Sequence, residues 1–206
     1  SRFPNVEVVV QEGNQRAMTE MLREDQLDLM LCNLVNQEGE LEYEHLCWDP
    51  VIFLVQSAHP CCRYARYRDT FYHPWIDLRE FEQEIFILQH QGQSLRQYSD
   101  QLLEEAGLSP QRITRIRNIE TAAQMAANGL GVSFCLESYF RHMMFIQPPY
   151  RFSVGERQLA ADFSAAYRRG RQLPEYTVQF IHLLKNLMEM EVGRMVEMDK
   201  SVNKNL

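Results

Sequence analysis

Two predicted helix starts in this chain of 206 residues carry hydroxyl side chains that can bind a ligand. Ser94–Gln97 follows a predicted strand over Ile85–Leu88, and Thr121–Gln124 follows a predicted strand over Ile113–Arg117. In both tetrapeptides a hydroxyl residue precedes Gln by three positions, which is the capping-box pattern. A hydroxyl that caps a helix can also donate its proton to a ligand, so the two roles are compatible.

Polar residues fill both strand ends, over His90–Ser94 and Asn118–Thr121. The strands alternate with helices, and right-handed crossovers then produce a parallel sheet whose ligands lie at the carboxyl ends of the strands. The free amide groups and the dipole of a helix N-terminus favour an anion there. The sequence therefore predicts a site for a small anion or carboxylate at these two helix starts.

Several polar residues near these starts have both a functional and an ordinary interpretation. His90, Gln91 and Gln93 are either ligand contacts or a solvated loop. Arg96 and Arg117 can bind a carboxylate through two hydrogen bonds, but each also lies where exposure or pairing with Glu is natural.

The sequence gives little support for disulfide bonds, a metal site or catalysis. The five cysteines cannot all pair, and no C-x-x-C motif collects them, so we expect a reducing, cytosolic compartment. His59 with Cys61 and Cys62 offers three donors and no distant fourth, which favours a plain loop over a metal site. The carboxylates show no spacing that requires acid–base catalysis, and no Ser lies in a G-x-S-x-G motif. We therefore expect no catalytic residue, no metal and no cofactor.

Composition narrows the class of protein further. The chain is 45% hydrophobic and 24% charged, with 21 Lys and Arg against 28 Asp and Glu, a formal charge of −7. Such a surface repels a phosphate backbone, so this chain by itself is not expected to bind nucleic acid. No run approaches the about 18 apolar residues of a membrane span, and the N-terminal residues do not resemble a signal peptide.

Periodicity predicts further elements, which begin with a strand over Val6–Val10. The others are a helix over Gln15–Glu24, a strand over Leu27–Cys32, strands over Val51–Val55, Val132–Cys135 and Ala161–Arg168, a short helix capped by Asp77, and a long helix from Pro174 almost to Lys200. The long helix carries a Met-rich apolar stripe that serves as packing or as a dimer contact.

Specific residues in this order resemble the effector-binding domain of LysR-type transcriptional regulators. The matching pieces cover some 130 residues and are Phe3-Pro4-Asn5-Val6, Leu27-Asp28-Leu29, His59-Pro60, Asp77-Leu78, Glu105–Pro110 and Ala126–Val132. The resemblance implies an α/β fold of the type 2 periplasmic-binding-protein kind, in which two Rossmann-like subdomains are joined by crossing strands. Residues 1–52 and 169–206 would form subdomain I, and residues 53–168 subdomain II.

The resemblance also implies a site and partners. A small effector would lie in the cleft between the subdomains, with Ser94 as its hydroxyl contact and Asn118, Glu120 and Thr121 on the loop that closes one side; Asn33 would reach across from the other. The partners would be a second copy of the chain, RNA polymerase, and promoter DNA through an N-terminal winged helix-turn-helix. A solute-binding protein of a transport system and a small α/β enzyme are the alternatives.

This chain departs from the family pattern in three places. The DNA-binding domain and the first strand and helix of subdomain I are expected before Phe3 and are missing from the sequence. Leu136-Glu137 stands where a proline commonly ends the strand, which puts the local shape of the cleft in doubt. The helix from Pro174 is longer than the family pattern predicts.

Overall fold

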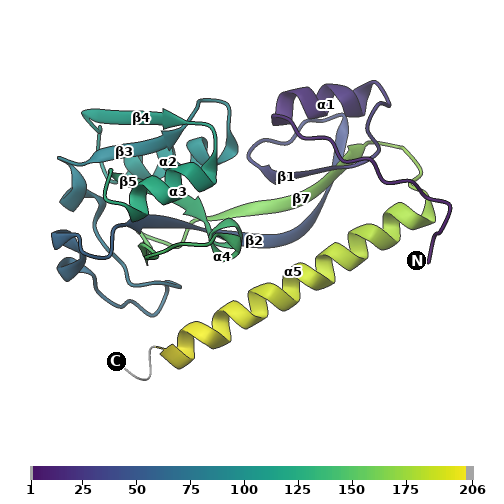
Figure 1. Ribbon diagram of the computed structural model, residues 1–206. Helices are drawn as coiled ribbons and strands as arrows, with labels where there is room; N and C mark the ends of the chain where they lie inside the picture. The colour runs from purple at the N-terminus through teal and green to yellow at the C-terminus, as the bar shows by residue number, and fades with distance from the viewer. Residues whose placement is uncertain (1, 203–206) are drawn as a thin grey trace. The chain divides into compact units, whose positions relative to one another are not determined.

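The computed structural model describes the backbone of residues 2–202 and the side chains of residues 2–190, except position 189 (Figure 1). Strands and helices alternate along most of the chain. In chain order the elements are α1 (Gln15–Arg23), β1 (Met30–Leu34), β2 (Leu41–Val55), the 3-10 helices η1 (Pro60–Tyr64) and η2 (Leu78–Phe81), β3 (Ile85–Gln89), α2 (Ser94–Glu105), β4 (Arg112–Ile116), α3 (Ile119–Ala127), β5 (Val132–Leu136), α4 (Glu137–His142), β6 (Tyr150–Phe152), β7 (Ala160–Arg168) and α5 (Glu175–Val202).

The chain forms two compact units. The first comprises the residues before Trp48 together with Asp162–Met195, and the second includes Trp48–Ala161. Strands β2 and β7 each contribute residues to both units, as expected for crossing strands. The mixed α/β architecture is therefore built from two units that share two strands.

In the first unit, β1 pairs antiparallel with β7. Side chains alternate across these strands, so Ala166 packs with Leu22 of α1, whereas its neighbour Ala165 packs with Leu46 and Ile181 of α5. Each face of this part of the sheet is thus covered by its own helix.

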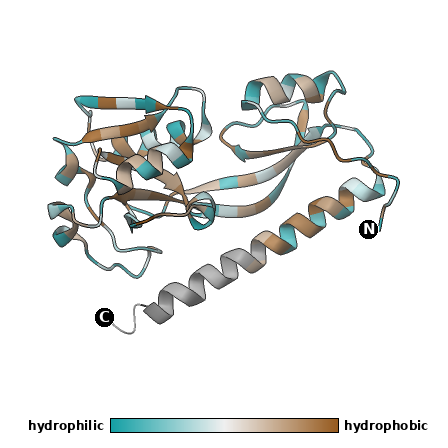
Figure 2. Cartoon of the chain, in the orientation of Figure 1, coloured by the Kyte–Doolittle hydropathy of each residue, from teal (hydrophilic) through white to brown (hydrophobic). Residues whose placement is uncertain are grey.

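In the second unit, β3 lies between β4 and β5 and is parallel to both. The antiparallel strands β5 and β6 flank β2. Phe53 packs against the rings of Phe81 and Phe134, with ring centroids 5.1 Å apart in both pairs. On the opposite face Ile52 and Leu54 pack against α3. The sheet is consequently buried on both sides, and hydrophobic residues predominate in β3 and in the second half of β2 (Figure 2).

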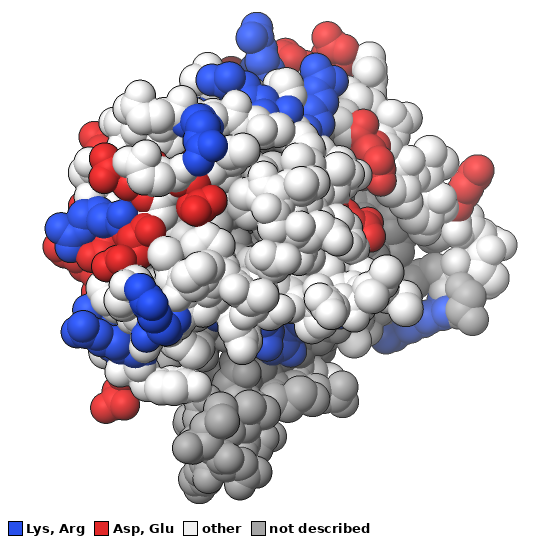
Figure 3. Space-filling view, turned by 60° about the vertical axis from the view of Figure 1, so that its left-hand side comes forward, with Lys and Arg blue, Asp and Glu red and all other residues white. Residues whose placement is uncertain are grey.

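Polar surface surrounds this core. On the face drawn in Figure 3, basic and acidic side chains stand next to one another at several points. Arg79 and Asp77 form one of the ion pairs among the described residues. Among the described residues, no helix has both the length and the apolar character needed to cross a membrane.

The predicted strand over Val6–Val10 is wrong. This segment is not hydrogen-bonded as a strand, and Val8, Val9 and Val10 are 77%, 70% and 82% exposed. Alternating β-branched residues favour extended backbone, but a strand exists only where a neighbouring strand pairs with it.

Two other strands differ from the prediction by more than one residue at an end. The strand predicted over Leu27–Cys32 is β1 and begins at Met30, because the amide groups of Gln26 and Leu27 donate to Met21 O at the end of α1. Strand β2 is much longer than the predicted Val51–Val55, since its first half alternates charged and apolar residues. Helix α4 and strand β6 were not predicted from the sequence, since they are only six and three residues long.

Gly131 joins α3 to β5 in a conformation that only glycine adopts without strain. Its φ is +147°, and a Cβ built there lies 2.3 Å from the carbonyl oxygen of Ile85 on the neighbouring strand. The close approach of the two backbones therefore requires a residue without a side chain.

We expect Gly131→Ala to lower the free energy of unfolding by more than about 1 kcal/mol, because the methyl group forces β5 away from β3. Chemical denaturation measures this change. Gly39→Ala is the matched control, since nothing lies within 4 Å of its added Cβ, and its effect should stay within about 0.5 kcal/mol. Equal effects of the two changes would contradict this account of Gly131.

Candidate functional site

The candidate site lies at one edge of the sheet in the second unit. The parallel register pairs Gln89, the last residue of β3, with Ile116, the last residue of β4. The loops that follow these strands therefore start side by side and lead into α2 and α3. The arrangement agrees with the expectation that both helix starts share one edge of a parallel sheet.

Gln93 ties these two loops together. Its Oε1 accepts a hydrogen bond from the amide of His90 at 3.1 Å, and its Nε2 donates to the carbonyl oxygen of Arg117 at 3.0 Å. The side chains of His90, Gln91 and Arg117 are exposed. Gln93 thus fixes the distance between the loops, and its neighbours remain accessible to a ligand.

The capping box predicted at Ser94 is wrong. Gln93 occupies the cap position of α2 with extended backbone, and its side chain accepts no amide group of that helix. Ser94 is already the first helical residue. Because the chain enters the helix one residue earlier than predicted, the hydroxyl of Ser94 belongs to the first turn.

The capping box predicted at Thr121 is wrong as well. Asn118 caps α3, and its Oδ1 accepts the backbone amide of Thr121 at 2.8 Å. The hydroxyl of Thr121 donates to the same oxygen at 3.2 Å. Asn is as good a cap residue as Ser or Thr, so Asn118, three residues before Thr121, was the cap signal available in the sequence. Glu120 lies in the exposed first turn.

Arg96 is paired with an acidic residue, as its ordinary interpretation predicted. The side chain is buried, its Nε lies 2.7 Å from Asp100 Oδ1, and its Nη1 donates to the carbonyl oxygen of Gln89 at 3.1 Å. These contacts hold the first turn of α2 against the end of β3. Whether Arg96 also touches a ligand remains a prediction.

Asn33 belongs to the first unit. It lies within β1, opposite Phe163, instead of in the loop after the strand. Its Oδ1 is buried and has no hydrogen-bond partner among the described residues.

Gln89 was missed by the sequence analysis. Its side chain is 0% exposed, and neither Oε1 nor Nε2 has a hydrogen-bond partner among the described residues. Leaving a buried donor or acceptor unpaired costs about 1–3 kcal/mol. A Gln at the end of an otherwise apolar strand, before a polar loop, was the available sequence signal.

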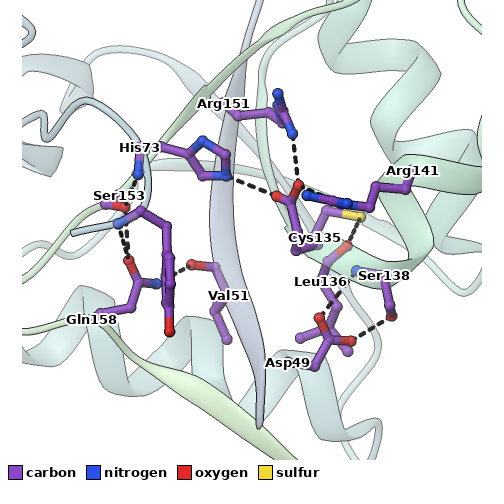
Figure 4. Close-up of polar contacts among 12 residues, drawn as sticks. Asp49, Val51, His73, Cys135, Leu136, Ser138, Arg141, Arg151, Ser153 and Gln158 are labelled. Atoms are coloured by element: carbon purple, nitrogen blue, oxygen red, sulfur yellow. Dashed lines mark hydrogen bonds and ion pairs between the residues drawn. The ribbon is translucent and has the colours of Figure 1, made fainter. Parts of the chain in front are cut away.

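A buried carboxylate organises the region around α4. In Figure 4, dashed lines run from His73, Arg141 and Arg151 to one carboxylate. The ion-pair distances identify it as that of Glu137, which is 1% exposed. The His73 Nε2, Arg151 Nη1 and Arg141 Nε atoms lie 2.8, 2.6 and 3.1 Å from its oxygens. Burial raises the pKa of Glu137, but the hydrogen bond from His73 and the nearby positive charges outweigh burial and lower the pKa to about 2. Glu137, which directly follows β5, is therefore the centre of a buried ion-pair cluster.

Asp49 holds the start of the same helix from β2. Its two carboxylate oxygens accept the amide and the hydroxyl of Ser138 (Figure 4). Burial raises the pKa of Asp49, although the hydrogen bonds from Ser138 oppose that rise. Leu136 at the cap position of α4 has no side chain that can accept a hydrogen bond from the helix, and Asp49 accepts that hydrogen bond instead.

The first unit contains a second polar cluster on β2 and β7. His45 Nδ1 and Ser164 Oγ each lie 2.7 Å from Asp162 Oδ1. Cys32 is opposite Ser164 on β1, and burial together with the charge of Asp162 raises the pKa of its thiol to about 11. The thiol is therefore protonated near neutral pH and is a poor nucleophile.

His59, which the sequence analysis considered with Cys61 and Cys62 as a possible metal site, makes structural contacts instead. The Nδ1 of His59 accepts the amide of Cys61 at the start of η1, and its Nε2 lies 3.3 Å from Glu84 Oε1. Among the described residues, no three His, Cys, Asp or Glu side chains form a group that could hold a metal ion.

Comparison with known protein families gives one match over most of the chain. Residues 1–189 match the family described as "LysR substrate binding domain". An uncharacterized HTH-type transcriptional regulator, YybE of Bacillus subtilis, is 28% identical over 131 residues, and the HTH-type transcriptional regulator CysL of the same organism is 24% identical over 139 residues. The alignments cover 64% and 68% of this chain but only 42% and 44% of those proteins.

Solved structures share the fold at low sequence identity. The regulatory domain of Synechocystis CcmR in complex with 2-PG has a TM-score of 0.74 and is 18% identical, covering 91% of this chain and 86% of that one. The BenM effector-binding domain with benzoate has a TM-score of 0.74 at 16% identity, covering 93% and 82%. The QuiR effector-binding domain with shikimate has a TM-score of 0.68 at 18% identity, covering 86% and 79%. The predicted type 2 periplasmic-binding-protein-like fold is confirmed.

We expect Asn118→Ala to destabilise the protein by about 1 kcal/mol, because the first turn of α3 loses its cap. Ser94→Ala should cost less, since Ser94 lies inside the first turn of α2 instead of at its cap. Denaturant titration of both variants gives the ranking. A larger loss in Ser94→Ala would contradict this ranking, because it would show that the Ser94 hydroxyl stabilises α2 more than the amide oxygen of Asn118 stabilises α3.

We expect Glu137→Gln to lower stability at pH 7, because two Arg side chains and His73 lose their common carboxylate. Breaking a buried ion pair costs about 3–5 kcal/mol, and the partial exposure of the two Arg side chains places this site near the lower limit. Thermal and chemical unfolding measure the loss. Glu156→Gln, an exposed position in the same unit, is the control.

The pH dependence of the same variant tests the lowered pKa of Glu137. The folded pKa is about 2 against an ordinary value of 4.5, so the contribution of Glu137 is present above pH 4.5 and lost as the pH falls toward 2. Glu137→Gln should therefore lose less stability than the wild type over this interval. An identical acid dependence in both proteins would contradict the assignment.

Proposed function

This chain belongs to the LysR substrate-binding domain family, and we propose that it is the effector-sensing part of a transcriptional regulator that binds a small carboxylate-bearing metabolite. The observation that supports a ligand site most directly is the parallel register of β3 and β4, which places two polar helix N-termini at one edge of the sheet. Amide groups at such termini favour an anion.

We assign the ligand contacts to the accessible residues of this edge. Ser94 offers its hydroxyl in the first turn of α2, and Asn118 offers its amide nitrogen. The hydroxyl of Thr121 donates to a ligand by turning away from Asn118 Oδ1. His90, Gln91 and Glu120 line the approaches, whereas Gln93 and Arg96 hold the loop and the helix in place. Asn33 of the first unit remains a further predicted contact.

The fold neighbours support the proposed class of ligand. CcmR, BenM and QuiR domains are described with 2-PG, benzoate and shikimate. We extend this class, a small molecule bearing a negative charge, to the present chain without naming its own effector. The domain binds its ligand and does not transform it chemically.

The mechanism we propose is differential binding. An effector with different affinities for two arrangements of the protein shifts the population between them, and it shifts nothing if the affinities are equal. In the whole regulator this shift would alter promoter contacts made by a DNA-binding domain, with a second copy of the chain and RNA polymerase as further partners. The named relatives are HTH-type transcriptional regulators, which favours this function over a solute-binding protein of transport.

Calorimetric titration with benzoate, shikimate and 2-PG tests the proposal. We expect Thr121→Val to weaken binding about 10-fold or more, because a hydrogen bond to a charged group is worth about 1.5–3 kcal/mol and each 1.4 kcal/mol is a factor of ten. Thr70→Val, at an exposed position of the same unit, should leave affinity unchanged. Turnover of any probe, or equal affinities of both variants and the wild type, would overturn this assignment.

A further inference from the structure

The buried amide of Gln89 is a polar group without a structural explanation. Polar side chains inside proteins are nearly always hydrogen-bonded, so an exception calls for an ordered water, a ligand or a function. Gln89 has both a donor and an acceptor unpaired among the described residues, and its side chain is fully buried. Its own carbonyl group, by contrast, is held by Arg96.

The register of the sheet shows which face Gln89 occupies. Gln89 and Ile87 lie on the same face of β3, because side chains alternate along a strand. Ile87 is paired with Ser133 of β5, so Ser133 and Cys135 share that face. Cys135 packs in a cluster with Ala123 of α3. Gln89 therefore lies on the face covered by α3.

Its position along the strand places Gln89 near the start of α3. Gln89 is the last residue of β3 and is paired with Ile116, from which the chain passes through Arg117 and Asn118 into α3. Ile119, the first residue of α3, packs against the same cluster on this face. Gln89 thus lies close to the first turn of α3, where the proposed ligand contacts lie.

We propose that Gln89 determines specificity by hydrogen-bonding an effector that bears both a carboxylate and a hydroxyl group. Its Nε2 donates to an oxygen of the ligand, and its Oε1 accepts from the ligand's hydroxyl, which a simple carboxylate lacks. This inference rests on the proposed function, because it assumes that the ligand binds at this edge of the sheet.

The lack of partners makes this role physically accessible. A Gln side chain has three rotatable bonds, and an amide without hydrogen bonds loses none when it turns toward the end of the strand. A ligand that supplies the missing partners satisfies both the donor and the acceptor of the amide. Sites built to hydrogen-bond a hydroxyl group discriminate strongly against analogues that lack it.

The test compares shikimate, a hydroxylated carboxylate, with benzoate, which has no hydroxyl group. Calorimetry is carried out on the wild type, Gln89→Leu, Gln89→Met as a second apolar replacement, and Gln97→Leu at an exposed position of α2 as the control. We expect the wild type to bind shikimate at least 10-fold more tightly than benzoate. Both Gln89 variants should lose that preference, and Gln97→Leu should keep it.

Thermal unfolding without ligand provides an independent measurement. Replacing an unpaired amide by an apolar side chain removes an unsatisfied group, so the melting temperature of Gln89→Leu and Gln89→Met should rise or stay constant. A fall in both variants with unchanged affinities would show that an ordered water or a structural contact satisfies Gln89, and would overturn this inference.

The outcomes also separate this inference from the proposed function. If the wild type binds a probe but shows no preference for shikimate, or if the Gln89 variants retain that preference, the role of Gln89 is overturned while carboxylate sensing stands. If the wild type binds neither shikimate, benzoate nor 2-PG, the proposed ligand class is overturned, and the role of Gln89 is overturned with it.

Discussion

The parallel alignment of β3 with β4 and β5 is the constraint on which the second unit depends. Parallel neighbours cannot be joined by a tight turn, so each connection must cross the sheet as a helix. Helices α2 and α3 are those crossovers, and their N-termini meet at the edge where β3 and β4 end. The same constraint that buries the sheet therefore gathers the amide groups, hydroxyls and polar loops of the candidate site.

That edge is rigid for identifiable reasons. Gln93 bonds to both loops, Asn118 caps α3, and Arg96 fixes the first turn of α2 to the carbonyl group of Gln89. A small ligand gains most from contacts that are already in place, because it then spends little binding free energy on ordering the protein. Gln89 differs from these residues, since its side-chain amide has no partner to hold it.

Glu137 illustrates what a buried charge requires of its surroundings. A buried carboxylate is tolerated only where opposite charges and hydrogen bonds compensate for lost hydration. Here His73, Arg141 and Arg151 supply them from three separate segments of the chain. Arg141 stands four residues after Glu137 on α4, a spacing that a sequence shows, but His73 and Arg151 come from distant segments, so the complete ion-pair centre emerged only when the chain was folded.

The sequence by itself determined the α/β class, most helices, the buried strands over Val51–Val55 and Ile85–Leu88, and the polar loops at the strand ends, because these depend on local periodicity and turn chemistry. Tertiary structure decided the rest. Val6–Val10 has the pattern of a strand but no neighbouring strand to pair with. Backbone geometry makes Gln93 and Asn118, not Ser94 and Thr121, the cap residues of α2 and α3. The side-chain amide of Gln89 is buried without a hydrogen-bond partner among the described residues only in the folded chain. Pairing, burial and charge compensation join residues far apart in the chain, and a local pattern cannot specify those partners.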